Sequence, residues 1–137
     1  HCKVAVKCEG QNVPVMASIL GSEKAKGLSK FLTALDMRCA TCGLDRLRVL
    51  VEGLSSFQAL SHLSLVHTAL EAEGAGMLAD ALTCTALTHL DLSHNRMGAE
   101  GAGMVAEALR SCTALAHLDL SGNWIGAEGA GMVAEAL

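Results

Sequence analysis

Histidines recur at a near-constant interval between residues 62 and 117, and they are the residues there best suited to chemistry. His62, His89 and His117 follow one another at almost equal steps, and two positions after them come Ser64, Asp91 and Asp119. An imidazole changes its charge near neutral pH and can bind a partner or a metal. The recurring histidines and the polar residues two positions after them therefore predict a polar, pH-sensitive contact strip, with a metal site as the less favoured alternative.

Cysteines form the second group that could do chemistry. Cys39 and Cys42 make a C-x-x-C pair downstream of Cys2 and Cys8, so a four-cysteine zinc site or a redox pair is conceivable. Against this, Cys42 occupies a position that later repeats fill with Leu, Met or Ile. A second slot is shared by Phe57, Cys84 and Cys112. Such a slot indicates a buried apolar layer, so we expect free thiols, no metal and no cofactor.

No pattern in the chain indicates catalysis. The stretch GSEKAKG, residues 21–27, contains Gly, Ser and Lys but lacks the G-x-x-x-x-G-K-[ST] order that cradles phosphate. No Ser–His–Asp or paired-carboxylate arrangement stands out from the repeated background. We therefore expect no catalytic residues, no small-molecule substrate and no enzymatic activity.

The elements that must position these side chains are repeats. The segment LTHLDLSHNRMGAEGAGMVAEAL from Leu87 recurs almost letter for letter from Leu115, as LAHLDLSGNWIGAEGAGMVAEAL, and a more distant copy begins at Leu60. A weaker copy begins at Leu32, so four units start at residues 32, 60, 87 and 115. Residues 1–31 are interpreted as a degenerate first repeat or a flanking segment, with a strand in KVAVKC and a helix in VPVMASIL.

Each unit has two halves with different periodicities. Leu90 and Leu92 alternate with polar residues, which predicts a short strand with one buried face. Asn95 and Asn123 follow at the strand exits of the last two units, where their amides can form a ladder that pairs backbone groups left open by the turns. The second half places apolar or small residues at helical spacing: Gly101, Met104, Val105, Ala108 and Leu109. At Gly101 the absence of a side chain should let the helix and strand layers approach closely. One strand–helix unit cannot bury its own apolar face, so neighbouring units must cover it.

Charge and hydropathy exclude two classes of partner. The net charge is −4, and residues 32–137 carry −7 of charge against +3 in residues 1–31. An acidic repeat body is unlike the basic footprint of nucleic-acid binding. No segment approaches the ~20 consecutive apolar residues of a membrane span. The chain starts at His1 and stops at Leu137 without a polar cap, so we expect a fragment of a longer array.

The spelling L-x-x-L-x-L-x-x-N-x-[LIM] followed by a helix resembles the leucine-rich repeats of the ribonuclease-inhibitor-like class. The resemblance implies a curved α/β solenoid with a parallel sheet on the concave side and helices on the convex side. It also implies a cytoplasmic module that binds a protein partner. Three alternatives remain: a regulatory or sensor domain of a larger nucleotide-binding receptor, a Ran-type GTPase-activating protein, or a structural component of an assembly.

The outward strand positions and the loops after them are the candidate binding surface. The residues expected to contact a partner are His62, His89, His117, Asp91, Asp119, Ser93, His94 and Trp124. The alternative for the histidine column is a solvated face copied by repeat duplication. For Trp124, whose slot holds Arg96 and Ala69 in the preceding units, the alternative is a loop side chain folded back over the next repeat.

Overall fold

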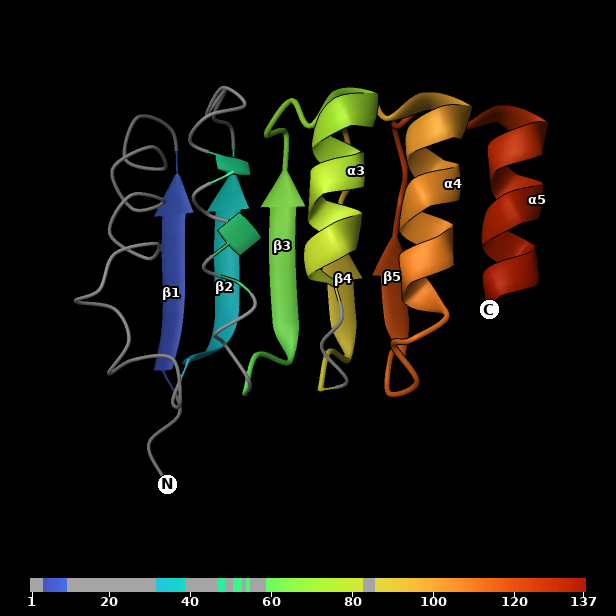
Figure 1. Ribbon diagram of the computed structural model, residues 1–137. Helices are drawn as coiled ribbons and strands as arrows, with labels where there is room; N and C mark the ends of the chain where they lie inside the picture. Colours follow the sequence, from blue (N-terminus) through green and yellow to red (C-terminus); the bar gives the residue numbers. More distant parts are fainter. Residues whose placement is uncertain are drawn as a thin grey trace.

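The described part of the chain forms a row of parallel strands with helices on one face (Figure 1). The computed structural model describes residues 4–9, 32–38, 47–48, 51–52, 54, 59–82 and 86–137. The strands stand in chain order: β1 (Val4–Glu9), β2 (Leu32–Arg38), β3 (His62–Val66), β4 (His89–Asp91) and β5 (His117–Asp119). The described helices are α3 (Glu71–Ala81), α4 (Gly98–Leu109) and α5 (Gly126–Ala136). The predicted mixed α/β fold with a parallel sheet is confirmed.

Each of the strands β3, β4 and β5 is followed by one helix, as the repeat pattern predicted. The strand expected in KVAVKC is also present, since β1 pairs with β2 in parallel. The helix expected at residues 13–20 lies outside the described residues. So do the side chains of Cys2, Cys8, Cys39, Cys42 and Cys84.

Alternation along the strands decides which face is buried. Leu63 and Leu65 in β3 are 2% and 1% exposed, and Leu90 in β4 is 2% exposed. The parallel register places Leu63 beside Leu90 and Leu90 beside Leu118, so one leucine row runs across the sheet. Because successive side chains on a strand point to opposite faces, the residues between the leucines form a second set of rows on the other face.

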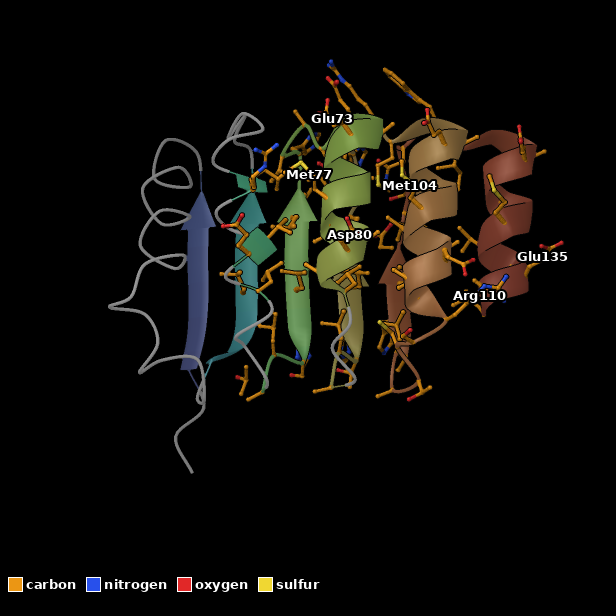
Figure 2. The ribbon with its side chains drawn as sticks, viewed as in Figure 1. Glu73, Met77, Asp80, Met104, Arg110 and Glu135 are labelled. Atoms are coloured by element: carbon orange, nitrogen blue, oxygen red, sulfur yellow. The ribbon has the colours of Figure 1, made fainter. Side chains whose placement is uncertain are left out.

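The apolar face of α4 is broader than its sequence spacing indicated. The buried residues of this helix are Gly101, Ala102, Val105, Ala106 and Leu109. Met104 and Ala108, which we expected on the buried face, are half-buried instead. The cause is that α4 contacts α3 and α5 on its sides as well as the sheet (Figure 1). Side positions are therefore partly covered by neighbouring helices, and Met104 lies toward α3 (Figure 2).

Gly101 confirms that a close approach requires glycine, although the neighbour is not the one expected. A Cβ at this position would lie 2.8 Å from the Cβ of Met97 and 3.3 Å from the Cα of Ala72. Met97 precedes α4, and Ala72 belongs to α3. The glycine therefore permits close contact with the preceding helix, whereas the sequence suggested contact with the strand layer.

Buried asparagines join the strand exits of successive units. Asn95 Oδ1 accepts hydrogen bonds from the N–H and the hydroxyl of Thr68, both at 2.9 Å. Its Nδ2 donates to the carbonyl oxygens of Leu65 (2.6 Å) and Leu92 (2.9 Å). Asn123 Oδ1 in turn accepts from the N–H of Asn95 at 2.8 Å. The predicted asparagine ladder is present, and Thr68 extends it by one unit.

The loops after the ladder turn through the left-handed backbone region. Gly98 and Gly126, the first residues of α4 and α5, have φ of 65° and 62°. Glu71, the first residue of α3, occupies the same place and has φ of 56°. Glycine adopts this conformation without the cost that a Cβ imposes. The later two units are thus better matched to their turns than the unit that begins at Leu60.

The last unit has an apolar edge. Leu118 and Leu120 are half-buried, and in α5 the only buried residue is Gly129. Leu137 is 74% exposed. Apolar side chains of this last unit are therefore partly exposed.

Candidate functional site

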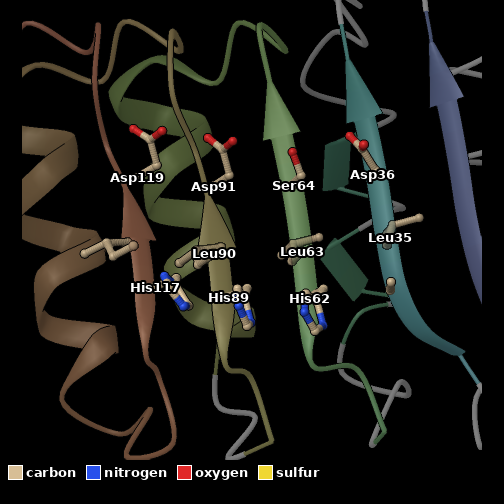
Figure 3. Close-up of a pocket in the computed structure, with 12 residues that line it drawn as sticks. Leu35, Asp36, His62, Leu63, Ser64, His89, Leu90, Asp91, His117 and Asp119 are labelled. Carbon is tan, nitrogen blue, oxygen red and sulfur yellow. The ribbon is translucent and has the colours of Figure 1, made fainter.

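The face of the sheet opposite the helices carries two rows of polar side chains (Figure 3). Hydrogen-bonded register aligns the first row, Ala34, His62, His89 and His117, and the second row, Asp36, Ser64, Asp91 and Asp119. We call these the histidine row and the aspartate row. The prediction that these positions lie in register on the face away from the leucines is confirmed.

The three imidazoles of the histidine row are stacked. The ring centroids of His62 and His89 are 4.1 Å apart, and those of His89 and His117 are 4.3 Å apart. Interplanar angles of 12° and 19° make both pairs nearly parallel. Desolvation lowers the pKa of the central His89, and charge repulsion from His62 and His117 lowers it further. Stacking thus favours the neutral form of the central ring.

The aspartate row is held by hydrogen bonds from its own strand exits. Asp91 Oδ1 accepts from the N–H of Ser93 at 3.0 Å. Asp119 Oδ1 accepts from the hydroxyl of Ser121 at 2.7 Å and from its N–H at 2.9 Å. These bonds lower the pKa of Asp119, with the hydroxyl contributing most, because they stabilise the ionised carboxylate. Both carboxylates are therefore fixed in position by the turn that follows them.

Between and around the two rows the sheet is hollowed. The hollow has a volume of about 500 Å³ and is lined by three residues from each of β2, β3, β4 and β5, including every member of both rows. Ser64 Oγ, at the centre of the aspartate row, is buried and makes no hydrogen bond to any described residue. The surface therefore combines apolar area with aligned polar groups, as ligand sites commonly do.

The loop residues of the predicted surface differ in their accessibility. His94 is exposed and stacks on His67 with ring centroids 4.6 Å apart, and its ring lies over Gly122. Ser93, which we expected on the binding surface, is only 5% exposed. The side chain of Ser93 is buried because β4 ends at Asp91 and the chain is already turning toward the ladder at Ser93. The inward–outward alternation of the strand therefore does not extend to this residue.

Trp124 projects from the loop between β5 and α5. It is 75% exposed, and the guanidinium carbon of Arg96 lies 5.8 Å from the centroid of its ring. The sequence placed the two residues in equivalent slots of successive repeats. It did not indicate their contact, which follows from the stacking of one loop on the next. The pair offers a cation–π contact beside the strand exits.

The described residues contain no group of three or more His, Cys, Asp or Glu side chains that could hold a metal ion. Cys112 is buried, with 5% of its surface exposed, and its Sγ lies 3.6 Å from the carbonyl oxygen of Leu82. This confirms the buried apolar slot predicted for that cysteine. No helix in the described ranges has the length and apolar character needed to cross a membrane.

The charged side chains of the helix layer form a separate surface. Glu73, Asp80, Arg110 and Glu135 lie on the outside of the helices (Figure 2). Arg110 pairs with Glu107 at 3.2 Å, with both side chains more than half exposed. Exposed pairs of this kind contribute little to stability. The helix face therefore provides a suitable control surface for experiments on the strand face.

Two segments of the chain, residues 83–106 and 111–134, match the family model described as Leucine Rich repeat. A search of the curated proteins finds no match. The first segment contains β4 and most of α4, and the second contains β5 and most of α5. Strand–helix units in register, a shared leucine row and two family matches one repeat apart together support a leucine-rich repeat protein.

Proposed function

We propose that the chain is a non-catalytic protein-binding module and that its partner docks on the histidine and aspartate rows. Leucine-rich repeats generally mediate protein–protein interaction, and the site chemistry favours the strand face for that role. The loop residues His94 and Trp124 would border the contact. Ser93 is left out of the proposed surface because its side chain is buried.

One observation carries the proposal: the three imidazoles are held in register, stacked and beside fixed carboxylates. Side chains that are already ordered lose little conformational entropy when a partner binds. The hollow of about 500 Å³ gives this array a concave shape into which partner side chains can insert. An exposed Trp next to the strand exits adds a residue type that is favoured in binding hot spots.

We also propose that the repeats belong to the ribonuclease-inhibitor-like class, with the sheet on the inside of a curved solenoid. The long step between the units that start at Leu60, Leu87 and Leu115, and the full helix in each of them, support this assignment. The proposed setting is the cytoplasm, where thiols such as that of Cys112 stay reduced.

Site-specific cross-linking tests the location of the contact. A photoreactive amino acid is placed at Asp91 on the strand face or at Glu107 on the helix face, and cross-linked proteins from cell extract are identified by mass spectrometry. We expect a partner that is captured from position 91 and not from position 107. The same partner should be lost when His62, His89 and His117 are all changed to Gln.

Capture from position 107 alone would move the binding site to the helices. Capture at position 91 that is unaffected by the triple substitution would remove the histidine row from the contact. Either result contradicts the proposed surface.

A further inference from the structure

Hydroxyl groups contact two of the three stacked imidazoles. Ser61 Oγ lies 2.8 Å from His62 Nδ1 and 3.2 Å from the carbonyl oxygen of Thr33. One strand further, Thr88 Oγ1 lies 2.8 Å from His89 Nδ1 and 3.1 Å from the carbonyl oxygen of Ser61. A carbonyl oxygen can only accept, and a hydroxyl has one proton to donate. Both contacts are hydrogen bonds at once only when the hydroxyl donates to the carbonyl and Nδ1–H donates to the hydroxyl.

This hydrogen-bond pattern decides what the imidazoles offer to a partner. A neutral ring with its proton on Nδ1 has its lone pair on Nε2, so that nitrogen accepts hydrogen bonds. The lowered pKa of His89 keeps the central ring neutral at neutral pH. Nδ1 is engaged by the preceding hydroxyl in His62 and His89, which leaves Nε2 as the acceptor for a ligand.

The aspartate row also offers acceptors. Asp91 and Asp119 each use Oδ1 for the hydrogen bonds from Ser93 and Ser121. For Oδ2 of the two carboxylates, no hydrogen bond to a described residue is formed. The hydrogen bonds from Ser121 lower the pKa of Asp119 and keep it ionised. Acceptors and negative charge thus lie side by side on neighbouring strands.

We propose that the strand face binds a protein segment carrying arginine or lysine side chains, which donate to the carboxylates of Asp91 and Asp119 and to Nε2 of His62 and His89. This inference rests on the proposed function and names the chemistry of the partner. Arginine has five N–H donors in a planar fork and no acceptor, so it complements an array of acceptors. An acidic segment would instead be repelled by the two carboxylates.

Acidification reverses the character of the histidine row. Protonation turns Nε2 into a donor and adds positive charge that repels a cationic segment. Among the side chains that the structure describes, the titratable groups on this face and its rim are His62, His89, His117, Asp36, Asp91, Asp119, His67 and His94. Imidazole is the side chain whose charge changes near neutral pH, so binding of a cationic segment should weaken between pH 7.5 and pH 5.5.

Selection from a random peptide library tests the proposal without knowledge of the natural partner. The whole chain is immobilised and used at pH 7.5 to select phage that display short random peptides. Selected peptides are then synthesised, and their affinities are measured for the chain and for two paired variants. Asp91→Asn with Asp119→Asn changes the strand face. Glu100→Gln with Glu128→Gln removes the same charge from equivalent exposed positions at the starts of α4 and α5.

We expect the selected peptides to be enriched in Arg and Lys relative to the unselected library. Losing two charge-assisted contacts should weaken their binding by about tenfold or more in the aspartate pair, with no comparable loss in the glutamate pair. Peptides that depend on the strand face but are neutral or acidic would overturn this inference and leave the proposed function standing. If no selected peptide depends on the strand face, both fail.

Two further measurements separate the hydrogen-bond pattern from general electrostatics. Nitrogen NMR of the imidazoles should show the proton on Nδ1 in His62 and His89. Thr88→Val should remove the preference for the Nδ1 proton in His89 and leave it unchanged in His62. His117 follows Ala116, which has no hydroxyl, and serves as the internal control. The proton on Nε2 in both His62 and His89, or tighter binding of the cationic peptides at pH 5.5 than at pH 7.5, would overturn the proposal.

Discussion

Replacing Asn95 should destabilise the junction between two repeats, and the loss of stability can be worked out from the hydrogen bonds that are removed. Asn95 is fully buried, and Asn95→Ala removes its amide from the ladder. The carbonyl oxygen of Leu65 gains the hydroxyl of Thr68, which turns to it from Asn95 Oδ1 across 3.1 Å, and the carbonyl oxygen of Leu92 keeps Asn123 Nδ2 as a donor. The N–H groups of Thr68 and Leu70 lose the Oδ1 acceptor that they share, at 2.9 and 3.5 Å. The substitution therefore leaves mainly these two buried N–H donors without their acceptor.

The expected loss follows from those two donors. A buried polar group that loses its partner costs about 1–3 kcal/mol, so Asn95→Ala should lower the free energy of unfolding by about 3–5 kcal/mol once lost packing is included. Thr68→Val is the matched control. It removes one ladder hydroxyl and leaves both the Thr68 N–H and the Leu65 carbonyl bonded to Asn95, so it should cost about 1 kcal/mol.

A third variant gives the ladder a pH signature. Asn95→Asp keeps the Oδ1 acceptor but places a carboxylate oxygen against the carbonyls of Leu65 and Leu92. Burial and these oxygens should raise its pKa in the folded state above the unfolded value of about 3.9. A raised folded-state pKa means that stability is lost as pH rises through that value, so the deficit should shrink as pH falls.

Urea unfolding followed by far-ultraviolet circular dichroism measures all three effects, at pH 7.5 and pH 5.0 with the unchanged chain as reference. The reasoning is refuted if Asn95→Ala costs no more than Thr68→Val, because the ladder bonds would then carry no net stability. An Asn95→Asp deficit that stays constant between the two pH values would show that the carboxylate escapes the buried site.

Further substitutions test the strand faces and the glycines. Leu92→Ala empties a fully buried position and should cost about 2–5 kcal/mol, whereas His89→Ala should stay within about 0.5 kcal/mol; equal losses in urea unfolding would mean that the strand faces are reversed. Gly98→Ala and Gly131→Ala both add a methyl group to open space, but φ is 65° only at Gly98. Thermal unfolding should therefore show a loss of about 1 kcal/mol at Gly98 and a gain of up to about 1 kcal/mol at Gly131. Gly101→Ala, also inside a helix, should destabilise by about 1–3 kcal/mol because its Cβ would lie 2.8 Å from the Cβ of Met97 and 3.3 Å from the Cα of Ala72 in α3; a stabilised variant would contradict these contacts.

Much of the architecture could be predicted from the sequence because each repeat folds into the same kind of strand–helix unit, whose pattern can be recognised locally. Alternation around Leu90 placed His89 and Asp91 on the outward face, and the nearly constant repeat step placed His62 and His117 beside His89. Parallel strands in register then require equivalent residues to stand in rows. The two polar rows were predictable for this reason.

Other features of the site depend on how one unit packs against the next. Ser93 is buried because the chain turns inward before the ladder, which strand alternation alone does not show. Thr68 joins the ladder because Asn95 of the next unit reaches its N–H and hydroxyl. In the helices, Met104 is half-buried because α4 has a helix on each side as well as the sheet beneath it.

The protonation pattern of the histidine row is also a property of the tertiary structure. The sequence shows Ser61 before His62 and Thr88 before His89, but it does not show that these hydroxyls reach the carbonyl oxygens of the preceding strand. Repeat spacing determines which residues become neighbours, because equivalent positions of successive repeats pair in register. Which atom of each residue donates or accepts is decided by distances between strands, because hydrogen bonds depend on separations of tenths of an ångström.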